Sequence, residues 1–301
     1  MSFGKIILGD NQFLGINHAS PDKALALDDK FAKPDAILEV IDWAYQAGLR
    51  DFMFTTHERL KPVFDEIVRS RLFAGMQYIP CLPYAHKYAN SLTNGGVKAV
   101  ITDHLGGCSK ARLIAGIGRL AVGDFAAVMQ LLVEIELLMT RGLNVKGVFL
   151  QNVIFDLIMG LRGHKLLARF DRYVSERFNA TPGYITMNHP LAQQVLCDEV
   201  GLQSPWICAN FYLAGFRMNP GQAEVEASFG NGRSRNIAMS IFASGALGAA
   251  GAVEHVRDFV GVDAILFGSS RRQNIEGNIA LISERASPAA THAGPILSAV
   301  S

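Results

Sequence analysis

The chain has 301 residues, of which 50% are hydrophobic and 18% charged, and this composition excludes a disordered, collagenous or low-complexity protein. Its 28 Lys and Arg residues almost balance 27 Asp and Glu residues, for a net charge of +1. Such a balance gives no general attraction for nucleic acid or for acidic membrane surfaces. The expected partner is therefore a small-molecule substrate.

Four cysteines, Cys81, Cys108, Cys197 and Cys208, lie far apart in the chain and form no CxxC pair. This spacing favours free thiols in a reducing compartment. The first residues, MSFGKIILGDNQF, lack the basic flank and long apolar region of a signal peptide. No apolar run reaches the roughly 18 residues of a membrane span. We expect a cytoplasmic protein that does not enter a membrane.

Short β-rich runs alternate with longer helical patterns along the chain, which is typical of repeated βα units around a parallel sheet. The predicted strands are 5–9, 50–55, 77–82, 145–151, 183–187, 206–210, 237–243 and 263–268. Amphipathic helices are predicted over 36–48, 127–142, 191–201 and 251–261, where apolar residues recur at helical spacing before a closing Gly. The order predicts an α/β fold, a single (β/α)8 TIM barrel over 1–301. A doubly wound open sheet is the alternative.

The connection after the third strand, residues 83–122, is much longer than an ordinary βα loop. It leaves the carboxyl end of the strand, where barrel enzymes keep their chemistry, so we expect a lid over the active-site mouth. A small surface hairpin or helix is the alternative.

Polar residues follow nearly every predicted strand, and in a barrel these residues converge on one mouth. Four of the eight histidines, His18, His57, His86 and His189, lie near strand ends. Histidine serves proton transfer near neutral pH, so these four are candidate catalytic residues, with Tyr84 and Lys87 beside His86 as further candidates. The candidate substrate contacts are Asn11, Gln151, Asn152, Asn188 and Asn210.

Imidazoles from several strands also suit a divalent metal. No HxH pair or HExxH helix is present, and the acids near these histidines are essentially Asp10 and Glu58. The favoured use of these histidines is therefore hydrogen bonding or proton transfer without a metal, and a metal held by the histidines is the alternative.

The segment 265–282 runs from a buried strand through Gly268, Ser269 and Ser270 into a helix that opens near Asn274. Free backbone N–H groups, hydroxyl groups and the cations Arg271 and Arg272 together predict a phosphate-binding loop at this point of the barrel. Alternatively, the serines only cap the helix.

The segments SIFASGAL (240–247) and GVDAILFGSSRRQNIEGN (261–278) resemble the seventh and eighth strand regions of the aldo-keto reductases. Weaker similarity is present in ILEVIDWAYQAGLRDF and ILGDNQFLG. The resemblance implies a barrel that binds NADP, a nicotinamide dinucleotide phosphate. The cofactor contacts that it implies are Ser240, Ser244, Gly245, Gly268, Ser269, Ser270, Arg271, Asn274, Glu276 and Asn278.

The chain departs from the Asp, Tyr, Lys and His tetrad of that family. The expected Asp falls on Phe54 or Thr55, and the expected Tyr on Arg59 or Leu60. No Lys ends the third strand, and the expected His falls on Gln151 or Asn152.

Three functions are compatible with this pattern. The first is a divergent NADP-dependent reductase of a small carbonyl or sugar-like compound. The second is a lyase, isomerase or hydrolase that uses rim histidines and holds a substrate phosphate in the same loop. The third is a barrel that binds a ligand without catalysis.

Overall fold

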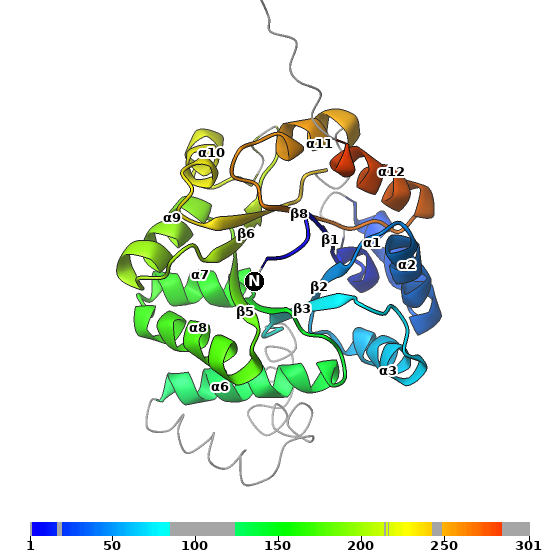
Figure 1. The fold of residues 1–301 in the computed structure, drawn as a ribbon, viewed down its shortest axis with the longest axis horizontal. Helices are drawn as coiled ribbons and strands as arrows, with labels where there is room; N and C mark the ends of the chain where they lie inside the picture. Colours follow the sequence, from blue (N-terminus) through cyan, green and yellow to red (C-terminus); the bar gives the residue numbers. More distant parts are fainter. Residues whose placement is uncertain are drawn as a thin grey trace, which may run out of the picture.

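A closed barrel of eight parallel strands in sequence order forms the centre of the protein, and β8 pairs back onto β1 (Figure 1). The structure is a computed structural model that describes residues 2–16, 20–84, 124–213, 215, 217–242 and 249–284. The strands are β1 (Ile6–Leu8), β2 (Asp51–Thr55), β3 (Gln77–Leu82), β4 (Gly147–Leu150), β5 (Thr181–Thr186), β6 (Trp206–Asn210), β7 (Arg235–Met239) and β8 (Ala264–Phe267). The predicted TIM barrel is confirmed, and the open sheet is excluded because this sheet has no edge.

Helices surround the barrel on its outer face (Figure 1). In the part of the chain that the structure describes, they are α1 (Pro21–Lys30), α2 (Pro34–Gln46), α3 (Lys61–Ser70), α6 (Phe125–Glu136), α7 (Asn152–Gly160), α8 (His164–Phe178), α9 (His189–Gln194), α10 (Gln222–Gly230), α11 (Ala249–Arg257) and α12 (Arg272–Ser283). The four predicted helices form with shifted ends as α2, α6, α9 and α11.

All eight predicted strands form, and the clearest difference in their ends is at β7. The sequence predicts a strand over 237–243, whereas β7 covers Arg235–Met239. Ser240 follows with a φ of 63°. This left-handed conformation ends the extended chain, so Ser240 lies at the strand exit rather than within the strand.

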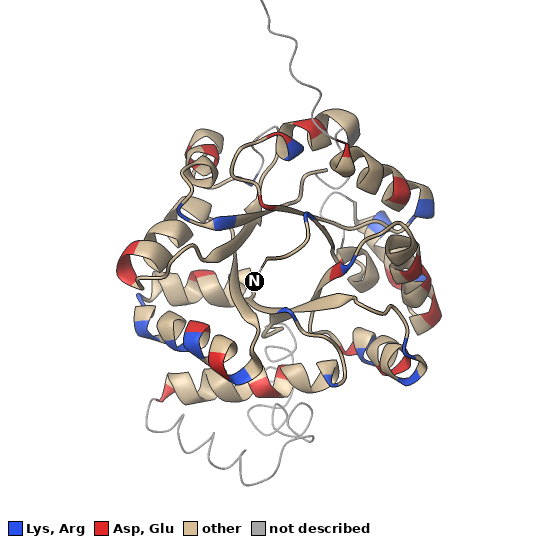
Figure 2. Ribbon diagram, viewed as in Figure 1, with Lys and Arg blue, Asp and Glu red and all other residues tan. Residues whose placement is uncertain are grey.

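Charge is confined almost entirely to the outer helices and the loops. Figure 2 shows Lys and Arg interspersed with Asp and Glu on the helices, and within the strands only Asp51 and Arg235 are charged. The arrangement follows from the parallel barrel, because each strand faces helices on one side and the filled barrel interior on the other.

Aromatic rings close the amino end of the barrel. The ring centroid of Phe3 lies 4.8 Å from that of Trp206 and 5.8 Å from that of Phe149. Figure 1 shows the N-terminus over the centre of the barrel, as this plug requires. Polar chemistry is therefore left to the opposite end, where the strands terminate.

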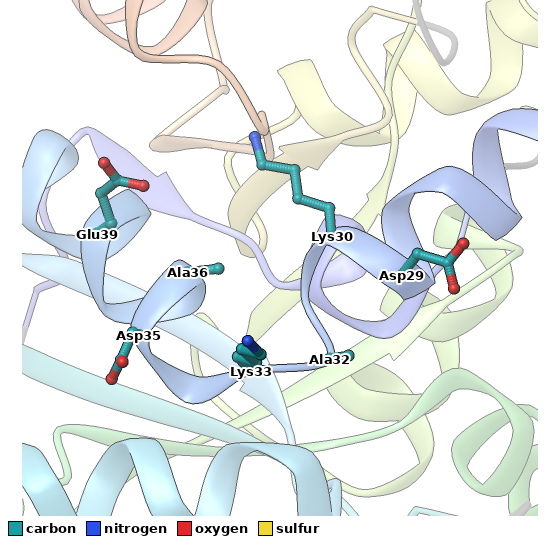
Figure 3. A pocket seen from close by; sticks show the side chains of 7 residues that line it. All are labelled: Asp29, Lys30, Ala32, Lys33, Asp35, Ala36 and Glu39. Atoms are coloured by element: carbon teal, nitrogen blue, oxygen red, sulfur yellow. The ribbon is translucent and has the colours of Figure 1, made fainter.

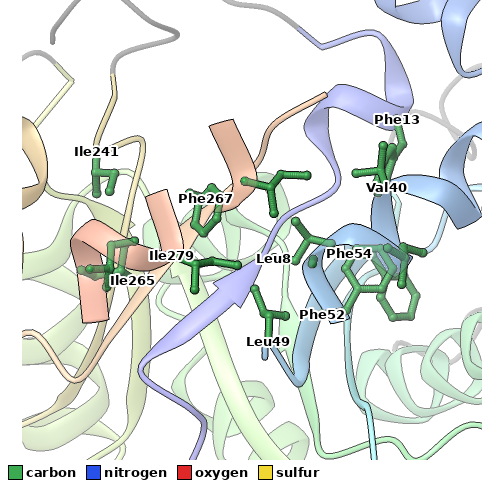
Figure 4. Close-up of a cluster of buried hydrophobic side chains, with 14 of the residues drawn as sticks. Leu8, Phe13, Val40, Leu49, Phe52, Phe54, Ile241, Ile265, Phe267 and Ile279 are labelled. Carbon is green, nitrogen blue, oxygen red and sulfur yellow. The ribbon is translucent and has the colours of Figure 1, made fainter. Parts of the chain in front are cut away.

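A second apolar layer fills the space between the strands and the outer helices (Figure 4). Around β1 it includes Leu8, Phe52, Phe54 and Phe267, which are at most 3% exposed, and α2 contributes Val40. This packing fixes the ends of β1, β2 and β8 relative to one another. The candidate site is built on those three ends.

The predicted lid over 83–122 lies outside the described residues except for Pro83 and Tyr84. Among the described cysteines, Cys81, Cys197 and Cys208 are free thiols. None of the described helices is both long enough and apolar enough to cross a membrane.

Gly183 leaves room for the Phe149 ring inside the barrel, and this close approach is the basis of the first prediction. A Cβ atom at Gly183 would lie 2.3 Å from two carbons of the Phe149 ring, and Phe149 is fully buried. We expect Gly183→Ala to lower the free energy of unfolding by about 2 to 3 kcal/mol, because an overpacked core must shift. Urea denaturation measures the change.

The matched control is Gly251→Ala in α11, where a Cβ atom would meet open space. Because Ala is the better helix former, this variant should be as stable as the wild type or more stable by up to about 1 kcal/mol. Equal stability of the two variants would contradict the packing described here.

Candidate active site

Asp10 follows β1, and its carboxyl group joins the end of that strand to β2. The side chain is buried, and Oδ2 accepts a hydrogen bond of 2.6 Å from the backbone N–H of Thr55. The Thr55 hydroxyl in turn accepts a hydrogen bond of 3.3 Å from Nε2 of Gln151, which follows β4. The ends of three strands are thus connected at the carboxyl-end mouth.

Burial gives Asp10 a titration range near neutrality. Desolvation raises its pKa from 3.8 to about 6, while hydrogen bonds from Thr55 oppose the shift. Burial, and then the charge of Asp10, raise the pKa of the Tyr84 phenol and of the Cys81 thiol. Tyr84 and Cys81 therefore stay protonated at neutral pH, and Asp10 is the group of this cluster that exchanges a proton there.

Two predicted catalytic residues, His57 and Tyr84, lie side by side, with ring centroids 5.1 Å apart. Nδ1 of His57 accepts a hydrogen bond of 3.1 Å from the backbone N–H of Arg59. Neutral His57 therefore carries its proton on Nε2, and can donate a hydrogen bond from that atom. The other candidates His18, His86 and Lys87 lie outside the described residues.

His189, another predicted catalytic residue, does not contact this group and lies between α9, α10 and β7. It is 1% exposed, with Nε2 2.8 Å from Oδ1 of Asn236 and Nδ1 2.7 Å from Oγ of Ser228. Burial lowers its pKa to about 4, against the opposing hydrogen bond of Asn236. His189 is thus neutral, with Nε2 donating to Asn236, and its contacts with Ser228 and Asn236 hold α9 against α10 and β7.

The predicted substrate contacts separate into two kinds. Gln151 contacts the Asp10 cluster through Thr55, whereas Asn188 caps α9 by accepting a hydrogen bond from the Leu191 N–H. Asn210 is buried and donates to the Arg217 carbonyl group, which shapes the loop after β6. Asn152 begins α7, and Asn11 begins a short 3-10 helix over Asn11–Leu14.

The predicted phosphate-binding loop lies between β8 and α12, and α12 begins at Arg272, two residues before the predicted start. Ser269 Oγ accepts a hydrogen bond of 3.4 Å from the Arg271 N–H. No side chain caps the helix. Within the described ranges no acidic side chain pairs with Arg271, while Arg272 pairs with Glu276. The first turn of α12 can therefore receive an anion.

The remaining predicted cofactor contacts have distinct positions. Asn274 and Asn278 lie in α12, where Asn278 is 9% exposed. Ser240 follows β7, and Ser244 and Gly245 lie outside the described residues. At Gly268 a Cβ atom would lie 2.1 Å from Oε1 of Gln12, so any other residue there would require the Gln12 amide group to move.

Sequence reasoning names Asp10 only as one of the few acids near the histidines. The signal was present, since Asp10 directly follows a predicted buried strand, but spacing does not reveal how deeply a side chain is buried. Among the described residues, no group of three or more His, Cys, Asp or Glu side chains is placed to hold a metal ion.

No family model matches the chain, and a search of curated proteins finds no match. Solved structures do match over most of their length. An aldo-keto reductase described from Pseudomonas aeruginosa is 13% identical, with 94% of this chain and 90% of that chain covered and a TM-score of 0.58. The apo form of Gox0644 is 10% identical, with 96% and 89% covered and a TM-score of 0.56.

A thermostable aldo-keto reductase, Tm1743, solved with the inhibitor epalrestat, is 8% identical, with 95% and 92% covered and a TM-score of 0.60. The chain therefore has the fold of the aldo-keto reductases. The resemblance seen in the sequence over its last part is confirmed at the level of the fold and extends over nearly the whole barrel.

The structural assignment of His189 generates the second prediction. We expect His189→Ala to lower the free energy of unfolding by about 3 kcal/mol, because the change removes buried hydrogen bonds and leaves a cavity. His164 is the matched control: its side chain is 26% exposed and 2.9 Å from Glu199. His164→Ala should cost less than about 1 kcal/mol. If urea denaturation gives both variants a similar loss in the free energy of unfolding, the buried contacts of His189 do not stabilise the fold more than the exposed contact of His164.

Proposed function

We propose that the protein is an NADP-dependent oxidoreductase that interconverts a small carbonyl compound and its alcohol at the carboxyl-end mouth of the barrel. The observation that carries the proposal is the buried carboxyl group of Asp10, with a pKa of about 6. Carbonyl reduction needs a proton donor that can be recharged near neutral pH. The aldo-keto reductase fold supports the redox assignment by analogy.

Asp10 takes the role of proton donor in this proposal. In its acid form it donates a proton to the substrate oxygen that becomes the alcohol, and in its ionised form it accepts that proton back. The Thr55 N–H fixes the position of the carboxyl group. Tyr84, whose phenol stays protonated because burial raises its pKa, donates a hydrogen bond to the same oxygen, and His57 lies beside Tyr84. This set replaces the tetrad that the sequence lacks.

The residues after β8 fit the cofactor that the fold implies. Gly268 has no side chain to block the approach of a ligand to the backbone. Ser269 accepts a hydrogen bond from the Arg271 N–H. α12 has no side-chain cap, and no described acidic side chain pairs with Arg271 at its start. These residues would hold the phosphate of NADP. When bound, the nicotinamide ring supplies or takes up hydride.

A second function uses the same acid. A carboxylate with a pKa of about 6 is also a suitable base for proton abstraction from a phosphorylated substrate, as in an isomerase or lyase. A barrel that only binds a ligand is less well supported, because Asp10 costs stability that binding alone does not require. Binding of nicotinamide dinucleotides distinguishes the first function from the other two.

The third prediction concerns Asp10→Asn. Reduction of a small aldehyde or ketone by NADPH should slow by about 10²- to 10⁴-fold, because the amide cannot transfer a proton. In the wild type, kcat/KM for reduction should fall as pH rises through about 6, since the acid form is consumed. Stopped-flow rates across the pH range measure both. An unchanged rate in the variant would remove Asp10 from the mechanism.

The free energy of unfolding of Asp10→Asn, measured against pH, is the control that shows this variant is folded. Burial raises the pKa of Asp10 in the folded state, so wild-type stability is greatest below the ordinary value of 3.8 and falls as pH rises through about 6. Asp10→Asn lacks this fall. At pH values above about 7 it should be more stable than the wild type, by up to about 3 kcal/mol.

The fourth prediction concerns the phosphate-binding loop. The wild type should bind NADPH in a fluorescence or calorimetric titration, and Arg271→Ala should weaken that binding by about 1.5 to 3 kcal/mol, the range of a charge-assisted hydrogen bond. The control residue is Arg233, which lies in the loop before β7 and forms an ion pair with Asp198. Arg233→Ala should bind NADPH normally. Failure of the wild type to bind any nicotinamide dinucleotide would overturn the proposed function.

A further inference from the structure

Gln151 reaches across the mouth of the barrel from the end of β4 to the end of β2. Its Nε2 donates a hydrogen bond of 3.3 Å to Oγ1 of Thr55. β3 lies between these two strands and pairs with both of them. The Gln151 side chain therefore spans the end of β3, and it brings its amide group to the same Thr55 that contacts Asp10.

The backbone of Gln151 is fixed on both sides, which leaves its side chain available for this contact. Its N–H donates a hydrogen bond of 3.0 Å to the Leu82 carbonyl group at the end of β3. Its carbonyl group accepts hydrogen bonds from the N–H groups of Ile154 and Phe155 in the first turn of α7. Gln151 directly precedes α7, but its side chain does not cap that helix. Helix capping therefore does not explain the side chain, which contacts Thr55 instead.

The hydrogen bonds around the Thr55 hydroxyl group have one direction. An amide nitrogen such as Nε2 can only donate, so the hydroxyl accepts from Gln151 and keeps its single proton for another acceptor. That acceptor is the Asp10 carboxyl group, with which the Thr55 side chain forms a hydrogen bond. With the Gln151 amide turned around, Thr55 would donate to Gln151, and its side chain would have no proton left for ionised Asp10, which can only accept.

The two carboxyl oxygens of Asp10 have different roles because of these contacts. Oδ2 accepts a hydrogen bond of 2.6 Å from the Thr55 N–H. A proton on Oδ2 would weaken that bond, since the hydroxyl oxygen of a carboxylic acid is a poorer acceptor than its carbonyl oxygen. The acid form of Asp10 therefore carries its proton on Oδ1.

Thr55 provides backbone and side-chain hydrogen bonds that oppose the effect of burial on Asp10. Hydrogen bonds to an ionised carboxylate stabilise that form, so they hold the pKa of Asp10 below the value that burial alone would give. Burial, and then the charge of Asp10, raise the pKa of Cys81 in β3 and of Tyr84 after it, so both stay protonated near neutral pH. His57 lies against Tyr84.

We infer that Gln151 and Thr55 are positioning residues for Asp10: the Gln151 amide holds the Thr55 hydroxyl as a donor to the carboxyl group, and the transferable proton is held on Oδ1. When Oδ1 gives that proton to the substrate oxygen, both Thr55 donors stabilise the negative charge left on Asp10. The inference rests on the proposed function, in which Asp10 is the proton donor, and it names the residues that set the pH range of that donor.

The test measures the titration midpoint of Asp10 by NMR of its ¹³C-labelled side-chain carboxyl carbon, in the full chain without ligands. Thr55→Val should raise the midpoint by about one pH unit, because it removes one hydrogen bond to the ionised form. Thr55→Ser keeps the hydroxyl group and should leave the midpoint within about 0.3 pH unit. Gln151→Glu should raise it by about one pH unit or more, since the new carboxylate takes the Thr55 proton and adds a like charge.

Exposed aspartates provide the internal control for these titrations. Asp29 and Asp35 line a surface hollow between α1 and α2 (Figure 3). Neither belongs to the set of contacts that the substitutions change, so the titration of each should be the same in every variant.

A second comparison shows whether Gln151 acts through Thr55. Gln151→Met removes the amide donor without adding charge. It should raise the Asp10 midpoint by about 0.3 to 0.5 pH unit when Thr55 is present and leave it unchanged in Thr55→Val. In kinetics, the pH at which kcat/KM for reduction by NADPH falls should move upward together with each midpoint, because the acid form persists to higher pH.

The outcomes separate the positioning role from the proposed function. If Thr55→Val leaves the midpoint unchanged, or if Gln151→Met has the same effect in both backgrounds, the positioning role is overturned while the role of Asp10 remains. If the midpoints move as expected but the protein reduces no carbonyl compound with NADPH, the redox function fails and the positioning role stands. If Thr55→Val does not fold, all its aspartates titrate near the ordinary 3.8, and Gln151→Glu decides.

Discussion

The hydrogen bond from the Thr55 N–H to the buried Asp10 carboxyl group is the interaction on which the candidate site depends. Thr55 is held in register by the pairing of β2 with β3, opposite Cys81. The barrel therefore fixes the carboxyl group to a rigid strand end rather than to a loop. A raised pKa of about 6 shows that burial outweighs the stabilising hydrogen bonds. The folded state carries this cost at neutral pH, which is typical of groups retained for chemistry.

His189 shows that the same physical effect leads to a different role elsewhere in the barrel. Burial favours the neutral form of both groups, because it lowers the pKa of His189 and raises the pKa of Asp10. Both ring nitrogens of His189, however, are used by Ser228 and Asn236, and Asn236 also donates to the carbonyl groups of Phe229 and Gly261. His189 therefore stabilises packing between helices and strand, whereas Asp10 stays beside polar groups at the mouth.

The strands, their order and their closure follow from sequence periodicity, because buried parallel strands are short apolar runs separated by helices. The position of the candidate phosphate-binding loop was also predictable, since Gly268, Ser269 and Arg271 are adjacent in the chain. The burial of Asp10 and the contacts of His189 were not. They depend on partners such as Thr55 and Asn236, which lie 45 and 47 residues away, and a single sequence contains no signal for such distances.

The central claim is that a carboxyl group at the end of β1 titrates near neutral pH, and NMR tests it directly. The side-chain carboxyl carbons of aspartate are labelled with ¹³C and titrated, and the spectrum of Asp10→Asn assigns the Asp10 signal by its absence. The account predicts a midpoint near the value of about 6. A midpoint at or below the ordinary 3.8 would show a carboxylate that is permanently ionised at neutral pH, and would contradict the assignment of Asp10 as the proton donor.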